Sequence, residues 1–186
     1  MRSAAVQAGI DTGAAVLAFP GGAMDMIAAW IAHTDAAMVA ALPAESLAGL
    51  PVRERIGGLV RFRLDQAAGK EESLRRALAI MAMPQNAGRA LALGWASADR
   101  MWRLAGDESS DFNHYSKRAI LAGIYAATLG VFVDDKSEAK AETLAFLDRR
   151  IAGVIRFEKA KARLLPMQKE HFSLVRLLGR LRYPAR

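Results

Sequence analysis

Apolar residues recur at three- and four-residue spacings along most of the chain, which is the period of an α-helix. Within residues 23–41, for example, Ile27, Trp30, Ile31 and Met38 keep mostly to this spacing. No segment shows a convincing alternation of apolar and polar residues, which a strand with one buried face would show. The pattern therefore predicts an all-α fold.

Prolines, glycines and capping residues divide this pattern into separate helices. The expected helices cover residues 3–8, 12–19, 23–41, 52–67, 71–83, 87–105, 112–133, 137–161 and 168–181, and residues 43–51 form a linker. Thr12 and Ser137 are expected to cap their helices, and Gly106 is placed to end the helix before it. The helix over 112–133 becomes apolar on all sides. It therefore belongs at the centre of the core or along an apolar cavity.

Composition narrows the class of protein. Of the 186 residues, 53% are hydrophobic, which is enough to bury the core of one domain and excludes wholesale disorder. The chain has no Cys, which excludes disulfides, thiolate catalysis and Cys-ligated metals. Its longest uncharged run, residues 119–133, falls short of the ~20 apolar residues that a membrane-spanning helix needs. With no recognisable signal peptide either, we expect a soluble, cytoplasmic chain.

The positive charge is concentrated near the C-terminus. The net charge is +7, and residues 151–186 hold nine Lys or Arg against two Asp or Glu, so the rest is neutral. Residues 168–182 would form a helix with one apolar and one basic face, which is typical of a membrane-surface helix. The expected membrane contacts are Leu174, Val175, Leu177, Leu178, Leu181, Arg176, Arg180 and Arg182. Packing of this helix on the body, or across a dimer, is the alternative.

Motifs of catalytic and cofactor sites are missing from the sequence. Gly57-Gly58 is not followed by the Lys-Ser or Lys-Thr of a phosphate-binding loop, and no Ser lies in a Gly-x-Ser-x-Gly elbow. Asp111-x-x-His114 is a single imperfect pair, whereas helical di-iron sites need two Glu-x-x-His pairs and further Glu. We therefore expect no enzyme activity, no cofactor and no metal site.

The N-terminal segment, residues 4–20, resembles the helix-turn-helix of TetR-type regulators in its succession of helix, glycine turn and helix. The second helix, residues 12–19, would enter the major groove, but it has no Lys, Arg, Asn or Gln to contact phosphates or base edges. The segment is therefore predicted to be a degenerate module that lacks its first helix. A TetR-type transcription regulator that binds DNA and an apolar effector remains the alternative function.

The stretch from Met101 to Tyr125 carries the most specific motifs. They are Met101-Trp102, Ala105-Gly106-Asp107, Ser110-Asp-Phe-Asn113, Tyr115, Arg118, Leu121 and Ile124-Tyr125. This run resembles the lipid-binding accessory proteins of ubiquinone biosynthesis, a family of TetR-like fold, and suggests a bacterial member. The implied architecture is a TetR-like helical bundle with a degenerate N-terminal helix-turn-helix and a C-terminal amphipathic helix. Its parts would be residues 1–22, the body 23–165 and the tail 166–186.

The resemblance implies a non-catalytic homodimer that holds an isoprenoid quinone intermediate and presents it to a late-step di-iron hydroxylase at the inner membrane. The implied contacts with this hydroxylase form a surface patch of Asp99, Met101, Asp111, His114, Tyr115 and Arg118. His114 departs from the family, where a Trp is usual, and Arg100 stands where an acid can occur. The uncharged helix and the eight Met residues suggest where the lipid would lie. Its expected walls are Met81, Leu93, Leu121, Tyr125 and Leu129, on the helices over 71–83, 87–105 and 112–133.

Overall fold

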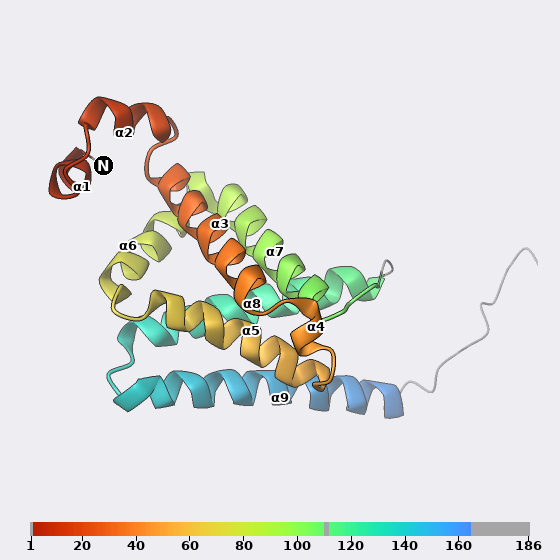
Figure 1. The fold of residues 1–186 in the computed structure, drawn as a ribbon. Helices are drawn as coiled ribbons and strands as arrows, with labels where there is room; N and C mark the ends of the chain where they lie inside the picture. Colours follow the sequence, from red (N-terminus) through yellow and green to blue (C-terminus); the bar gives the residue numbers. More distant parts are fainter. Residues whose placement is uncertain (1, 110–111, 165–186) are drawn as a thin grey trace, which may run out of the picture. The chain divides into compact units, whose positions relative to one another are not determined.

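The computed structural model describes residues 2–109 and 112–164, and every regular element among them is a helix, which confirms the all-α class (Figure 1). The elements are α1 (Arg2–Gln7), α2 (Thr12–Ala18), α3 (Ala23–Ala41), α4 (Ala44–Leu47), α5 (Val52–Ala67), α6 (Glu71–Met81), η1 (Pro84–Asn86), α7 (Ala87–Leu104), α8 (Phe112–Asp134), η2 (Glu138–Lys140) and α9 (Ala141–Leu164). The chain divides into two compact units, residues 1–151 and 152–186. The predicted tail helix, residues 168–181, lies outside the described residues.

Three local expectations need correction. The side chain of Asp11, not Thr12, caps α2, because its carboxylate accepts a hydrogen bond of 2.8 Å from the Ala14 amide. The expected linker over 43–51 contains the four-residue helix α4. The helix expected to reach residue 83 ends at Met81, and a short 3₁₀ turn, η1, follows it.

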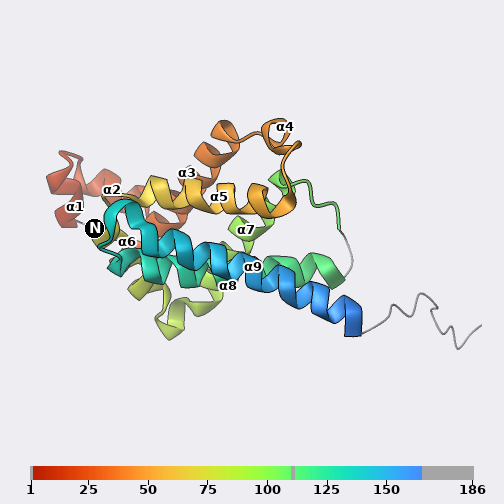
Figure 2. The same cartoon turned by 90° about the horizontal axis from the view of Figure 1, so that it is seen from below.

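The main core of residues 1–151 contains buried side chains from every α-helix from α3 to α9. Helix α3 packs against α5, α6 and α7, while α8 packs against α5, α6 and α7 (Figure 1, Figure 2). The most deeply buried apolar side chains are Met38, Leu59, Val60, Met101, Phe132 and Leu147. They come from α3, α5, α7, α8 and the start of α9, so each of these helices contributes its apolar face to one cluster.

Helix α8 combines a core face with a face on a cavity. By length and composition, residues 114–134 could cross a membrane, a test that core helices of soluble proteins also pass. The sequence argument against a membrane span had counted only the uncharged run of residues 119–133, which is shorter than this helix. Leu121 and Phe132 are buried in the core, whereas Tyr125 and Leu129 line a cavity. Both roles expected for an all-round apolar helix are therefore present in α8.

The connection from α8 to α9 is held by Asp135. Its carboxylate accepts hydrogen bonds from the amide and hydroxyl of Ser137, at 2.8 and 2.5 Å, and from those of Thr143, at 2.8 and 2.6 Å. These four donors lower the pKa of Asp135. Ser137 was the expected cap, and its hydroxyl does accept a hydrogen bond of 3.1 Å from the Glu142 amide. The buried Asp135 is nevertheless the principal anchor of the start of α9.

The turn that follows α7 fixes the start of the most specific motif. Gly106 has a φ of 83°, a left-handed conformation that favours glycine, and its amide donates to the Arg103 carbonyl at 3.0 Å. The expectation that Gly106 ends this helix is confirmed. The turn brings Asp107 back toward α8, where it forms ion pairs.

Candidate functional site

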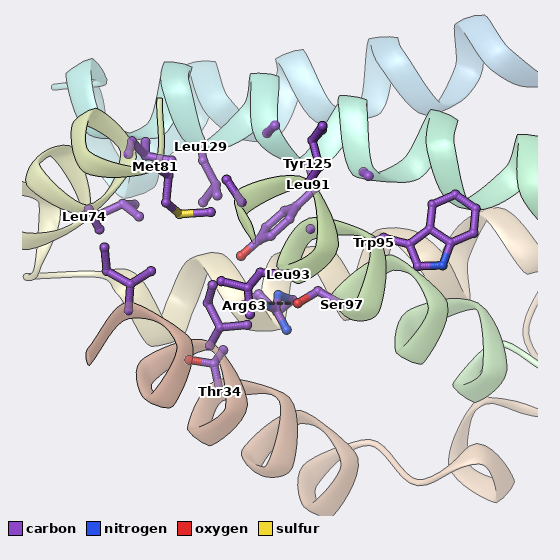
Figure 3. Close-up of a pocket in the computed structure, with 18 of the residues that line it drawn as sticks. Thr34, Arg63, Leu74, Met81, Leu91, Leu93, Trp95, Ser97, Tyr125 and Leu129 are labelled. Atoms are coloured by element: carbon purple, nitrogen blue, oxygen red, sulfur yellow. Dashed lines mark hydrogen bonds between the residues drawn. The ribbon is translucent and has the colours of Figure 1, made fainter. Parts of the chain in front are cut away.

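A cavity of about 590 Å³ lies among α3, α5, α6, α7 and α8. Its size is within the range of ~300–1,000 Å³ that is typical of small-molecule sites, and its lining is mainly apolar. Apolar lining residues from the different helices include Ile27, Trp30, Leu74, Leu78, Leu91 and Trp95. Figure 3 labels Leu74, Leu91 and Trp95 among the residues around the cavity. A cavity of this kind accommodates a molecule with a substantial apolar part.

Four of the five expected wall residues line this one cavity. They are Met81 on α6, Leu93 on α7, and Tyr125 and Leu129 on α8. The fifth, Leu121, is corrected: it is 2% exposed and belongs to the main core together with Met101. Leu121 precedes Tyr125 by four residues, which rotates it by about 40° around the helix axis. This rotation places Leu121 on the core side of α8.

Sequence reasoning missed the walls contributed by α3 and α5. Trp30, Ile31 and Thr34 come from α3, whereas Arg63 and Ala67 come from α5. The apolar spacing on α3 had shown that this face is buried, but not that it faces α8. For α5, the sequence did contain a signal: Arg63 lies on a helix face that is otherwise apolar, which marks a special position on that face.

The cavity has one polar region, which is built around Arg63. This residue is 3% exposed and forms an ion pair with the buried Asp35 of α3. Its second terminal nitrogen lies 3.3 Å from the Ser97 hydroxyl, and its guanidinium carbon lies 4.9 Å from the centre of the Tyr125 ring (Figure 3). Burial alone would lower the pKa of Arg63, but Tyr125 and Asp35 outweigh burial, so the pKa is raised. Arg63 therefore remains charged inside an apolar cavity.

The expected patch for a partner protein is only partly at the surface. Met101 and Arg118 are 0% and 1% exposed, so their assignment to a surface patch is wrong. Arg118 lies under the corner between α7 and α8, where its guanidinium donates to Asp99 at 2.5 Å and to Asp107 at 2.9 Å. Asp99 is partly exposed, and Asp111 lies outside the described residues.

His114 and Tyr115 form a small aromatic group with Trp95. The ring centres of His114 and Tyr115 are 5.1 Å apart, and those of Trp95 and Tyr115 are 6.1 Å apart. Tyr115 is 61% exposed, and Leu91, one turn before Trp95, is 75% exposed. Because Leu91 and Trp95 also line the cavity, this exposed apolar surface borders the cavity.

The ion pairs at the same corner predict a loss of stability in acid. Burial alone would raise the pKa of Asp107, but hydrogen bonds from Lys117, Ser109 and Arg118 lower it to about 2. A carboxylate with a lowered folded-state pKa contributes stability that is complete above its unfolded pKa, near 3.9, and is lost as the pH falls toward 2. We expect this contribution to be about 2 kcal/mol.

Urea unfolding at pH values from 5 to 2 measures this effect. The variant Asp107→Asn serves as the control, because other carboxylates titrate over the same range. Its free energy of unfolding should fall less steeply between pH 4 and pH 2 than that of the unmodified chain. Equal slopes would show that Asp107 does not contribute in this way.

Comparison with known proteins finds a family similarity in the segment that contains α7, α8 and most of α9. Residues 87–158 match the family model described as COQ9. Residues 87–158, the COQ9 region, are therefore similar to this family. This confirms the resemblance found in the motifs from Met101 to Tyr125.

Curated COQ9 relatives match a similar part of the chain. The rat protein "Ubiquinone biosynthesis protein COQ9, mitochondrial" is 45% identical over 92 residues, which are 50% of this chain and 30% of the relative. The human protein of the same name is 43% identical over 92 residues, 50% of this chain and 29% of the relative. The probable coq9 protein of Dictyostelium discoideum is 29% identical over 115 residues, 62% of this chain and 38% of the relative. The matched regions thus span about a third of the length of these relatives.

The COQ9 region contributes only part of the cavity. It supplies Leu93, Tyr125 and Leu129, and it contains the whole aromatic group of Trp95, His114 and Tyr115. Asp35 and Arg63 lie before it in the sequence. The described residues contain no group of three or more His, Asp or Glu placed to hold a metal ion.

Proposed function

We propose that this chain is a non-catalytic accessory protein of ubiquinone biosynthesis. It holds an isoprenoid quinone intermediate in the cavity and presents it to a late-step hydroxylase, acting as a homodimer at the surface of the inner membrane. The observation that supports this proposal most is an apolar cavity of about 590 Å³ whose α7 and α8 walls belong to the COQ9 region. The names of the relatives support a role in ubiquinone biosynthesis. The cavity supports the binding of an apolar molecule.

The chemistry of the cavity favours binding over catalysis. Each CH₂ group of an isoprenoid tail that leaves water for the apolar lining contributes ~0.8 kcal/mol. The ionisable groups that the cavity presents are the guanidinium of Arg63, which stays protonated, and the phenol of Tyr125. Proton transfer to or from a bound quinone ring would then be left to the partner enzyme.

The exposed aromatic surface beside the cavity suits contact with that enzyme. Tyr115 and Leu91 are exposed, and His114 and Trp95 pack next to them. Aromatic side chains are favoured at protein interfaces because they combine a large apolar area with a polar atom. The membrane contacts proposed for residues 168–182 would bring this surface to the bilayer, where such lipids partition.

The alternative, a DNA-binding regulator, has less support. Helix α2 would be the reading helix, and its side chains Val16 and Leu17 are apolar and exposed. A reading helix instead needs donors and acceptors for base edges and phosphates. The helix-turn-helix origin of residues 1–22 remains a prediction.

Glycines on the cavity wall allow a direct test. Gly94 and Gly123 both line the cavity, and a Cβ atom added at either one meets no other atom within 4 Å. Leucine at these positions would fill space that the lipid tail occupies, and it would also raise helix propensity by up to ~1 kcal/mol per site. We expect Gly94→Leu/Gly123→Leu to retain at least tenfold less co-purified isoprenoid lipid, measured by native mass spectrometry, with an unchanged or higher melting temperature.

Gly88→Leu is the matched control. Gly88 lies on α7, an added Cβ atom there also meets nothing within 4 Å, and the residue is not on the cavity wall. This variant should keep its lipid. If unmodified protein carries no isoprenoid lipid and takes up none, or if the double variant retains as much as Gly88→Leu, the proposed use of the cavity is wrong.

A further inference from the structure

Helices α1 and α2, which are six and seven residues long, form a hairpin before α3. They pack mainly against each other, and both views of the fold show them beyond the start of α3 (Figure 1, Figure 2). No residue of α2, which the structure describes in full, is buried. Short helices are marginal in water, and most helical stability in proteins comes from packing of an apolar face. The hairpin therefore presents a helix surface that another molecule can cover.

The exposed surface of this hairpin is aliphatic. Its large exposed side chains are Val6, Ile10, Val16 and Leu17. Leu17 is 83% exposed, which is the highest value among the large exposed apolar side chains of the described residues. Residues 3–24 contain a single charged residue, Asp11. Clustered apolar side chains with so little charge around them mark a contact with an apolar partner.

The size and composition of this surface favour a lipid bilayer over a protein. A stable protein interface takes about 20–30 residues from each partner, and aromatic residues, Met and Arg are enriched in it. The two helices together are shorter than that, and their large exposed side chains are all aliphatic. Binding to the interfacial region of a bilayer instead scales with the apolar area that is buried. A small aliphatic hairpin can supply such area.

The backbone of the hairpin is also suited to leaving water. A backbone amide that enters an apolar layer needs a hydrogen-bond partner within the protein. In the turn, the Ile10 amide donates to the Ala5 carbonyl at 2.9 Å. At the start of α2, the Ala14 amide donates to the Asp11 carboxylate at 2.8 Å. Both bonds lie within the hairpin, so they are kept when it moves from water to lipid.

We propose that the hairpin of α1 and α2 is a membrane-insertion site, which places Leu17 and its aliphatic neighbours among the acyl chains of a bilayer. This contact goes beyond the proposed function, in which residues 168–182 make the membrane contacts. The two sites differ in their driving force, because the hairpin has no Lys or Arg after Arg2. Salt and anionic lipid, which govern the binding of a basic segment, should leave insertion of the hairpin unchanged.

A fluorophore at Leu17 tests insertion directly. Because the chain has no Cys, the full chain with Leu17→Cys takes a single label of the environment-sensitive dye NBD. Phosphatidylcholine vesicles, in salt of about 1 M where the Debye length is ~3 Å, should raise its emission severalfold and shift it to the blue. The control is Leu50→Cys with the same dye. Leu50 is an exposed leucine before α5, and its label should not respond.

Serine variants measure how much the hairpin contributes to binding. Val16→Ser/Leu17→Ser should lower partitioning into the same neutral vesicles at least tenfold, measured by flotation, because two aliphatic side chains no longer leave water. Val39→Ser/Leu50→Ser also removes one exposed Val and one exposed Leu, and it should partition as the unmodified chain does. Neither variant changes a buried side chain, so both should keep their melting temperature.

Three results would overturn the insertion site. The first is Leu17 emission that does not respond to neutral vesicles, or that rises only with anionic vesicles at low salt, which would leave the basic segment as the membrane contact. The second is emission that is high without vesicles and depends on protein concentration, which would show that a second copy of the chain covers the hairpin. The third is equal partitioning of the two serine variants. None of these results bears on lipid in the cavity, which the glycine variants test separately.

Discussion

Replacing Arg118 with Met is expected to lower the free energy of unfolding by about 3 kcal/mol. Arg118 is 1% exposed and donates to Asp99 and Asp107, which lie at the two sides of the turn after α7. Removing it leaves two carboxylates near the interior without their shared cation. The cost stays at the lower end of the range for buried pairs, because Lys117 remains 2.6 Å from Asp107.

Arg103→Met is the matched control for this measurement. Arg103 donates a hydrogen bond of 2.7 Å to the same Asp99, which lies one turn before it on α7. Its side chain, however, is 71% exposed. Such a pair contributes about 0.3–0.5 kcal/mol. Urea unfolding followed by circular dichroism compares the two variants. A loss for Arg118→Met as small as that for Arg103→Met would show that the corner does not depend on its buried cation.

This corner explains why the motif around Arg118 was misread as a surface patch. The motif runs along α8, where Tyr115 is exposed and Arg118, three residues later, is buried. Nothing in the local sequence separates the two, since residues three apart lie on neighbouring parts of a helix surface. Arg118 is drawn inward by Asp107, and Asp107 comes within reach only because Gly106 reverses the chain.

Helix boundaries were predictable where glycine or proline residues, which end helices, flank the helix. The helices α3 and α5 begin and end at the expected residues because a glycine pair, two prolines and Gly69 surround them. Helix α4 was missed because four residues are too few to show a helical period. The cap of α9 was misplaced because the stronger acceptor, Asp135, lies two residues before Ser137 and is itself buried.

The cavity was predictable in part for a different reason. Helices α6, α7 and α8 follow one another in the sequence, so a slot between them could be guessed from their apolar faces. The walls from α3 and α5 depend on packing between segments that are far apart in the sequence. The contact of Asp35 with Arg63 joins residues 28 positions apart, and helical periodicity carries no information about such a pair.

Breaking this buried pair is expected to have the largest effect on stability. Asp35→Ala leaves the charge of Arg63, which is 3% exposed, with only Ser97 and Tyr125 beside it. The free energy of unfolding should fall by about 3–5 kcal/mol, as for other buried pairs that lose one partner. Urea unfolding of delipidated protein measures this loss without a contribution from bound ligand.

The double variant Asp35→Leu/Arg63→Met should recover most of that loss and come within about 1 kcal/mol of the unmodified chain, because apolar side chains can replace a buried ion pair without net cost. If the double variant is as unstable as Asp35→Ala, the pair is needed for folding itself. If stability returns, folding does not require a charge at this point of the cavity.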